Sequence, residues 1–121
     1  MKLEYSKQYI IFRFLKDDQI ETLEPVSVII DGSLIIEVPK GFITDGASIP
    51  VFFHRLIGHP FKSKFIVPAL IHDFCYTSHC VSKDYADTVF YKGLLSYNVP
   101  KWRAWMMWKS VKWFGKSAWK N

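Results

Sequence analysis

The feature of the sequence that most constrains the fold is a pair of apolar runs separated by a turn dipeptide. Val26–Ile30 and Leu34–Val38 are rich in β-branched residues, and Asp31 and Gly32 lie between them. Both turn residues accept the positive φ angles of a tight hairpin, so the runs are predicted to pair as antiparallel strands. Residues 9–15 alternate with a two-residue period and predict a further strand.

Beyond about residue 60 the apolar residues recur with the period of a helix. Residues 42–61 contain several glycines and prolines, and they predict an ordered loop with a short helical turn around 51–57. Three helices are predicted to follow, over residues 63 or 65 to 79, 82 to 97 and 100 to 119. Ser82 is expected to cap the second helix and Pro100 to open the third.

The pattern therefore predicts an α+β fold, with an N-terminal antiparallel β-sheet of about three strands followed by three α-helices packed on it. A chain of 121 residues is expected to form a single domain over 1–121. Its parts are a hairpin sheet at 1–40, an ordered loop carrying site residues at 41–62, and three helices at 63–121.

Composition argues against several classes of protein. The two cysteines are too few for a secreted disulfide framework, and residues 1–7 lack the features of a signal peptide. No apolar run approaches the roughly 20 residues of a transmembrane helix. A reduced, soluble intracellular protein is expected.

The candidate site lies in the first two predicted helices. His72 and Tyr76 are four residues apart and share a helix face. Asp73 lies about 100° away from His72 around the same helix axis. Asp84 and Asp87 project from the next helix. An imidazole beside carboxylates is suited to general-base chemistry or to a hard divalent cation, calcium or magnesium. The alternative is a half-buried histidine with ordinary helix-end and surface acids.

Asp45 extends this candidate site. It lies in a turn of small residues, where the backbone can approach a ligand closely. We predict that the loop folds against the helices, so that Asp45 approaches His72 and so that Asp73 and Asp87 line the same pocket. The metal candidates are therefore Asp45, Asp73, Asp84 and Asp87, and the alternative is a plain turn closed by local hydrogen bonds.

Zinc is a weaker candidate than calcium or magnesium, because no cysteine or histidine pair has the spacing of a known zinc motif. Cys75, Cys80 and His79 could together capture a soft metal. A cysteine on an apolar helix more often behaves as a small buried hydrophobic residue.

The third predicted helix combines aromatic and basic residues. Residues 101–121 carry six basic residues and no acid, whereas residues 1–100 carry ten basic residues against eleven acids. One interpretation is a face that meets anionic lipid, nucleic acid or an acidic partner. The alternative, which we expect, is that the tryptophans cover the core while the lysines stay in water. The residues of this face are Trp102, Trp105, Trp113, Lys109, Lys112 and Lys116.

Several segments together resemble a known protein family. They are Gly41 to Pro50 (GFITDGASIP), Ala69 to Asp73 (ALIHD) with Tyr76, Ser82 to Asp87 (SKDYAD), and Phe114-Gly115. In this order they resemble the small phage-encoded proteins of the domain of unknown function 1353 family. Lys83 and Lys112 stand where that pattern has arginine, which keeps the charge but not the planar fork.

This resemblance implies an α+β fold and a bacteriophage or prophage origin, with a place in the host cytoplasm or the virion. It implies no established reaction. The partners that it suggests are a phage protein or a host protein.

A second, local resemblance covers residues 72–76 (HDFCY). They are similar to the helix of calcium-dependent secretory phospholipases, in which the histidine activates water and the next aspartate binds calcium. The tyrosine and a later aspartate orient the histidine. Carried over, this makes His72 the base, Asp73 the metal ligand, and Tyr76 with Asp84 or Asp87 the orienting groups. The disulfides and glycine-rich calcium loop of those enzymes are missing from this chain.

Two hypotheses follow for the function. The first is a small hydrolase with a water-activating, metal-assisted site at Asp45, His72, Asp73 and Asp87. The second is a non-catalytic virion component or host-target-binding accessory protein, in which the same polar cluster locks the loop onto the helices. Chemistry requires the groups to converge on an open cleft, whereas a lock buries them in mutual hydrogen bonds.

Overall fold

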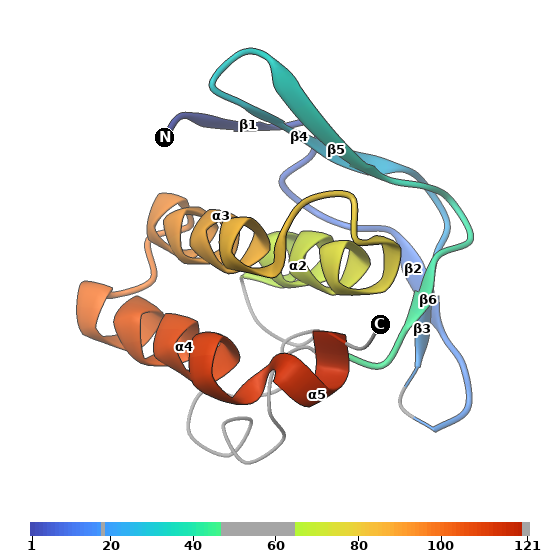
Figure 1. Ribbon diagram of the computed structural model, residues 1–121. Coiled ribbons are helices and arrows are strands. Elements are labelled where there is room, and N and C mark those ends of the chain that lie inside the picture. The colour runs from blue at the N-terminus through green and yellow to red at the C-terminus, as the bar shows by residue number, and fades with distance from the viewer. Residues whose placement is uncertain (18, 47–64, 120–121) are drawn as a thin grey trace.

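The computed structural model describes residues 1–17, 19–46 and 65–119. Two antiparallel sheets of three strands come first, and helices follow, so the predicted α+β arrangement is confirmed (Figure 1). The first sheet has the order β1 (Leu3–Tyr5), β4 (Val26–Ile30), β5 (Leu34–Val38). The second has the order β2 (Phe12–Phe14), β3 (Ile20–Thr22), β6 (Ile43–Thr44).

The hairpin of β4 and β5 has the predicted strands and the predicted tip. Val26 pairs with Val38 and Ile30 with Leu34, and the backbone N–H of Ser33 donates to the carbonyl oxygen of Ile30 at 3.1 Å. Between them Asp31 and Gly32 have φ angles of 51° and 74°, the left-handed conformation that this turn requires. Ser33 adds one residue to the predicted two-residue connection.

The prediction of a single small sheet was incomplete. The strands that sequence reasoning missed have only two or three residues, too few for a two-residue period to be recognisable. Buried Thr22 joins the end of β3 to the chain leaving β5, because its Oγ1 donates to the Pro39 carbonyl oxygen at 2.8 Å and accepts from the Phe42 N–H at 3.0 Å.

The helices are α2 (Ile66–Ser78), α3 (Lys83–Ser96), α4 (Lys101–Phe114) and α5 (Lys116–Trp119). Ser82 caps α3 as predicted, since its side chain accepts a hydrogen bond from the backbone N–H of Tyr85 at 3.2 Å. The third predicted helix is interrupted at Gly115 and so forms α4 and α5. The predicted helical turn at 51–57 and the earlier start at residue 63 lie outside the described residues.

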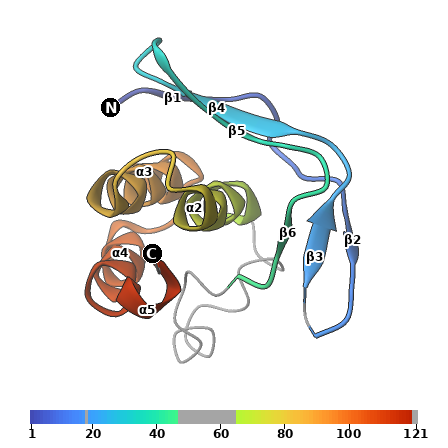
Figure 2. The same ribbon diagram turned by 45° about the vertical axis from the view of Figure 1, so that its right-hand side comes forward.

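Helix α2 lies at the centre of the molecule. It packs against β4 and β5 of the first sheet, against α3 and against α5, which explains why it is buried on most of its circumference (Figures 1 and 2). Helix α3 also contacts β1, whereas α4 lies against α3 on the side away from the first sheet. No helix within the described ranges is long and apolar enough to cross a membrane.

Gly93 allows the close approach of α3 to its neighbours. A Cβ atom at this position would collide with the Tyr5 hydroxyl of β1 and would lie 3.2 Å from the Pro68 Cβ of α2. Gly93→Ala is expected to lower the free energy of unfolding by about 1–3 kcal/mol, although alanine is the better helix former. Urea denaturation measures the change, and a stabilised variant would contradict this packing.

Candidate functional site

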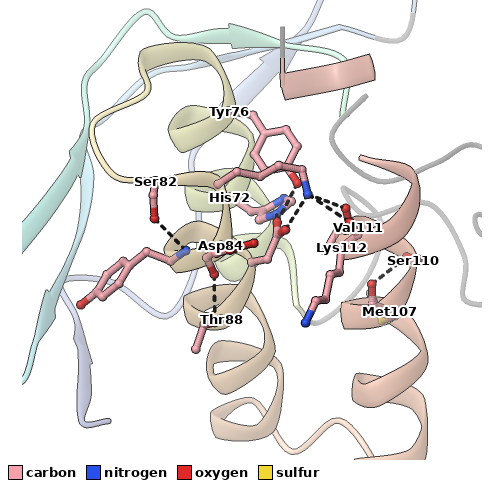
Figure 3. Close-up of polar contacts among 12 residues, drawn as sticks. His72, Tyr76, Ser82, Asp84, Thr88, Met107, Ser110, Val111 and Lys112 are labelled. Carbon is pink, nitrogen blue, oxygen red and sulfur yellow. Dashed lines mark hydrogen bonds and ion pairs between the residues drawn. The ribbon is translucent and has the colours of Figure 1, made fainter. Parts of the chain in front are cut away.

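The candidate site is built around the carboxylate of Asp87, where α2 and α3 lie side by side. Figure 3 shows two of its members, His72 and Tyr76. His72 Nε2 lies 2.7 Å from Asp87 Oδ1, and the Tyr76 hydroxyl donates to the same oxygen at 2.6 Å. Lys83 Nζ donates to Asp87 Oδ2 at 2.8 Å. The helical spacing that predicted a shared face for His72 and Tyr76 thus directs both side chains at one acceptor from the neighbouring helix.

Lys83 also ties the site to α4. Its Nζ donates to the carbonyl oxygens of Val111 at 3.0 Å and of Lys112 at 3.4 Å, near the C-terminal end of that helix. A lysine ammonium has three N–H donors, and these acceptors with Asp87 use them all. Sequence reasoning missed this role, although the four-residue spacing of Lys83 and Asp87 was a usable signal.

The charge states of the site follow from its burial. Burial lowers the pKa of His72, although the hydrogen bond with Asp87 opposes this, so the imidazole is neutral at neutral pH. Burial alone would raise the pKa of Asp87, but hydrogen bonds with His72, Lys83 and Tyr76 outweigh it and lower that pKa, so the carboxyl is ionised. Burial and the Asp87 charge raise the pKa of Tyr76, which keeps its proton.

These charge states determine the tautomer of His72. An ionised carboxylate can only accept hydrogen bonds, so the proton of the neutral imidazole must lie on Nε2, which faces Asp87. The other ring nitrogen, Nδ1, then carries the lone pair and is the basic atom of the ring. The arrangement can therefore orient a general base.

The site is deeply buried within the described part of the molecule. His72 and Asp87 are each 1% exposed. Of the two residues that form ion pairs with Asp87, only Lys83 has appreciable access to solvent. A pocket of about 170 Å³ opens between α3 and α4 on the Asp87 side of the network. It is lined by Asp84, Asp87, Thr88, Trp108 and Lys112.

Asp73 lies next to His72 in α2 but faces a different neighbour. It is 4% exposed, and its Oδ2 accepts a hydrogen bond from Thr44 Oγ1 at 3.1 Å. Thr44 Oγ1 in turn accepts from the Gly46 N–H at 3.3 Å. The first residues of the predicted loop thus contact α2, and Asp45 is exposed between these two contacts. Its later residues, 47–62, lie outside the described residues.

The structure therefore divides the predicted site residues into three groups. His72, Tyr76 and Asp87 form one hydrogen-bonded cluster. Asp73 bonds to the loop residue Thr44, which is followed by the exposed Asp45. Asp84 is an exposed residue of α3 that lines the 170 Å³ pocket.

Metal ligands do not converge among the described residues, where no three His, Cys, Asp or Glu side chains are arranged to hold an ion. The two thiols of the soft-metal suggestion are near each other, with Cys75 Sγ 3.8 Å from Cys80 Sγ. His79, the third group, is stacked on Trp119, with ring centroids 4.0 Å apart, and its Nε2 lies 2.7 Å from the Trp119 carbonyl oxygen.

The expectation that the tryptophans of the last helix cover the core was wrong for three of them. Trp102, Trp105 and Trp113 are 67%, 47% and 62% exposed, and the aromatic residue Phe114 is 55% exposed. Helix α4 packs its buried side against α3. None of the described residues covers the opposite side, which carries the three exposed tryptophans. The buried residues of α4 are Ala104, Met107, Ser110 and Val111.

The lowered pKa of His72 predicts that mild acid destabilises the protein. An unfolded chain protonates this histidine near pH 6.5, whereas the folded protein does so only at a lower pH. Between these two pKa values, the free energy of unfolding should fall by about 1.4 kcal/mol per pH unit as the pH is lowered. Denaturation curves at several pH values measure the slope. His72→Gln should flatten it, and an equally steep slope in this variant would contradict the assignment.

Comparisons with known proteins cover most of the chain. A family model described as "Protein of unknown function (DUF1353)" matches residues 20–111, which confirms the family resemblance of the sequence. Two relatives come from Sinorhizobium fredii (strain NBRC 101917 / NGR234). The uncharacterized protein y4jT is 39% identical over 79 residues, and the uncharacterized protein y4iH is 33% identical over 72 residues.

These alignments cover most of this chain but little of the relatives. They include 64% and 60% of the chain, but only 23% of y4jT and 30% of y4iH. The chain therefore matches less than a third of the length of either relative. No solved structure matches the chain.

Proposed function

Since this chain belongs to the DUF1353 family, whose function is unknown, we propose from its own geometry that it is a small hydrolase with His72 as the general base. The observation that carries the proposal is the contact of 2.7 Å between His72 Nε2 and the ionised Asp87. It fixes the tautomer in which Nδ1 accepts a proton.

The proposed reaction assigns each member of the cluster one role. His72 Nδ1 takes a proton from water as the water oxygen bonds to an electrophilic carbon or phosphorus of the substrate. The proton then passes to the leaving group. Asp87 stabilises the positive imidazolium ring in between, as an aspartate does beside the histidine of a catalytic triad. Tyr76 and Lys83 hold the Asp87 carboxylate in place.

The local phospholipase resemblance supports the same roles. In that helix a tyrosine and a later aspartate orient the histidine, and the sequence left open whether the aspartate is Asp84 or Asp87. The contacts of Asp87 with both His72 and Tyr76 favour Asp87.

Metal assistance is a separate part of the proposal. Asp73 would bind calcium or magnesium, with Asp45 as the next carboxylate of the adjoining loop. The support is chemical, because hard cations prefer carboxylate and backbone oxygens, and the contact between Thr44 and Asp73 brings the loop backbone to this carboxylate. Removal of the cation with a chelator should reduce turnover, and added calcium should restore it.

We also propose a bacteriophage or prophage origin for the protein. The support is the order of sequence segments shared with phage-encoded members of the family. The proposed place of action is the host cytoplasm or the virion.

One observation favours a second candidate function. His72 is 1% exposed, as expected for a polar lock that holds α2, α3 and α4 together rather than for an open catalytic cleft. Under this alternative the protein is a non-catalytic virion component or host-binding accessory protein.

The test is turnover of a panel of carboxylic and phosphate esters by the wild-type protein and by His72→Gln. The hydrolase proposal expects wild-type turnover whose acid limb lies below pH 6.5, because the pKa of His72 is lowered. It also expects loss of that turnover in the variant. Equal turnover by both proteins would refute His72 as the base, and no turnover by the wild type would favour the non-catalytic alternative.

A further inference from the structure

Three exposed tryptophans and two lysines of α4 form one continuous face. Successive residues of a helix are about 100° apart, so Trp102, Trp105, Lys109, Lys112 and Trp113 fall within an arc of about 100°. We call these five residues the outer face of α4. It is opposite the buried side of the helix, and it spans about 16 Å between Trp102 and Trp113.

The lysines of this face lie among its aromatic rings. Lys109 Nζ is 5.6 Å from the ring centroid of Trp105 and 5.2 Å from that of Trp113. Lys112 Nζ lies 5.0 Å from the ring centroid of Trp108, beside the same face. The surface therefore offers apolar ring area and positive charge together, with no acid in residues 101–121 to oppose an anionic partner.

We infer that the outer face of α4 docks on an anionic phospholipid bilayer. The inference does not depend on the hydrolase proposal, because it uses residues outside the His72 cluster. Tryptophan is favoured at the boundary between headgroups and acyl chains, and lysine is favoured beside anionic headgroups. A helix lying in the membrane plane would bury the rings of Trp102, Trp105 and Trp113 and leave the two ammonium groups at the level of the phosphates.

The apolar lining of this face favours a bilayer over a nucleic acid. Among the described residues, the two hollows along this face are lined by aromatic rings, Met106 and lysine, and Ser110 is the only neutral polar side chain. Nucleic-acid interfaces are polar and rich in hydrogen-bond donors. Helix α4 also lies on the side of α3 away from the first sheet (Figures 1 and 2), so its outer face is not turned toward that sheet.

The test is co-sedimentation of the whole chain with phosphatidylcholine vesicles that contain or lack phosphatidylglycerol, at roughly 0.05 M and 0.5 M salt. We expect binding only to the anionic vesicles, a loss of most binding at the higher salt, and a blue shift of tryptophan fluorescence on binding. Lys109→Gln with Lys112→Gln should weaken binding about 25-fold, which is about fivefold for each lysine near an anionic surface. Lys16→Gln with Lys40→Gln, at exposed positions in the N-terminal region, is the matched control.

Substitution of Trp102, Trp105 and Trp113 by serine should weaken vesicle binding more than tenfold and remove the blue shift. Tyr9→Ser is the matched aromatic control, because Tyr9 is 61% exposed and lies outside α4. The inference is overturned by absence of binding at the lower salt or by undiminished binding of the tryptophan variant. Tighter binding to duplex DNA than to anionic vesicles would also overturn it.

Discussion

Replacing Asp87 with asparagine is expected to lower the free energy of unfolding by about 3 kcal/mol or more and the melting temperature by roughly 10 °C. The side chain of Asp87 is 2% exposed and accepts hydrogen bonds from Tyr76 and Lys83 while facing His72. Asparagine keeps the volume but loses the charge, so the Lys83 ammonium is left without its anionic partner. Thermal and urea denaturation at pH 7 measure the loss.

Asp84→Asn is the matched control for this change. Asp84 lies three residues earlier in α3 and is exposed, so the same substitution removes only a favourable charge from the first helical turn. Asp84→Asn should therefore lower the free energy of unfolding by less than about 1 kcal/mol. Equal costs for the two variants would show that the Asp87 cluster does not hold the helices together.

His72→Gln is expected to reduce kcat by about 10²- to 10⁴-fold on any ester that the wild type hydrolyses. The glutamine amide can donate an N–H to Asp87 as the imidazole does, so the buried carboxylate keeps its hydrogen bond. The amide has no basic nitrogen, however, and cannot take a proton from water. Steady-state kinetics should therefore show a loss of activity in this variant, whereas its melting temperature should show that stability is largely retained.

His72→Ala and His79→Ala complete this experiment. His72→Ala should lose activity and also lower the melting temperature by several degrees, because Asp87 loses a hydrogen-bond donor in a buried position. His79→Ala removes an exposed histidine that stacks on Trp119, and turnover should be unchanged. Normal turnover by His72→Gln would leave the cluster with a purely structural role.

The fold could be predicted where local signals were strong. The hairpin was predictable, because Asp31 and Gly32 suit the left-handed turn between two strands of five residues. The division of the strands into two sheets was not, because it depends on pairings such as Glu21 with Ile43, which are distant in the sequence. The helix break at Gly115 was also missed, since the apolar spacing continues through it.

Helical spacing predicted part of the candidate site. It placed His72 and Tyr76 on one face, but it could not decide between Asp84 and Asp87, which are about 60° apart around α3. The four-residue spacing of Lys83 and Asp87 was a usable signal for their ion pair. The link from Lys83 to α4 was beyond the sequence, because two of its acceptors are carbonyl oxygens 28 and 29 residues away in α4. These contacts exist only because α4 packs against α3.

The exposure of the tryptophans was likewise a tertiary property. Periodicity shows which residues share a side of a helix, but it does not show whether a second layer covers that side. Helix α4 packs against α3, and Trp102 and Trp113 remain on the outer side.

The protonation of His72 tests the proposed general base most directly. Burial keeps this imidazole neutral, and the contact of Nε2 with the Asp87 carboxylate leaves Nδ1 as the basic atom. Two-bond ¹H–¹⁵N correlation spectra of the ¹⁵N-labelled protein distinguish a protonated ring nitrogen from one with a lone pair. Between pH 5.5 and 7.5, a window of about one unit on either side of the ordinary value, we expect the proton to remain on Nε2 and the Nδ1 signal to keep the shift of an unprotonated nitrogen. A proton on Nδ1, or titration of the ring near pH 6.5, would contradict the account.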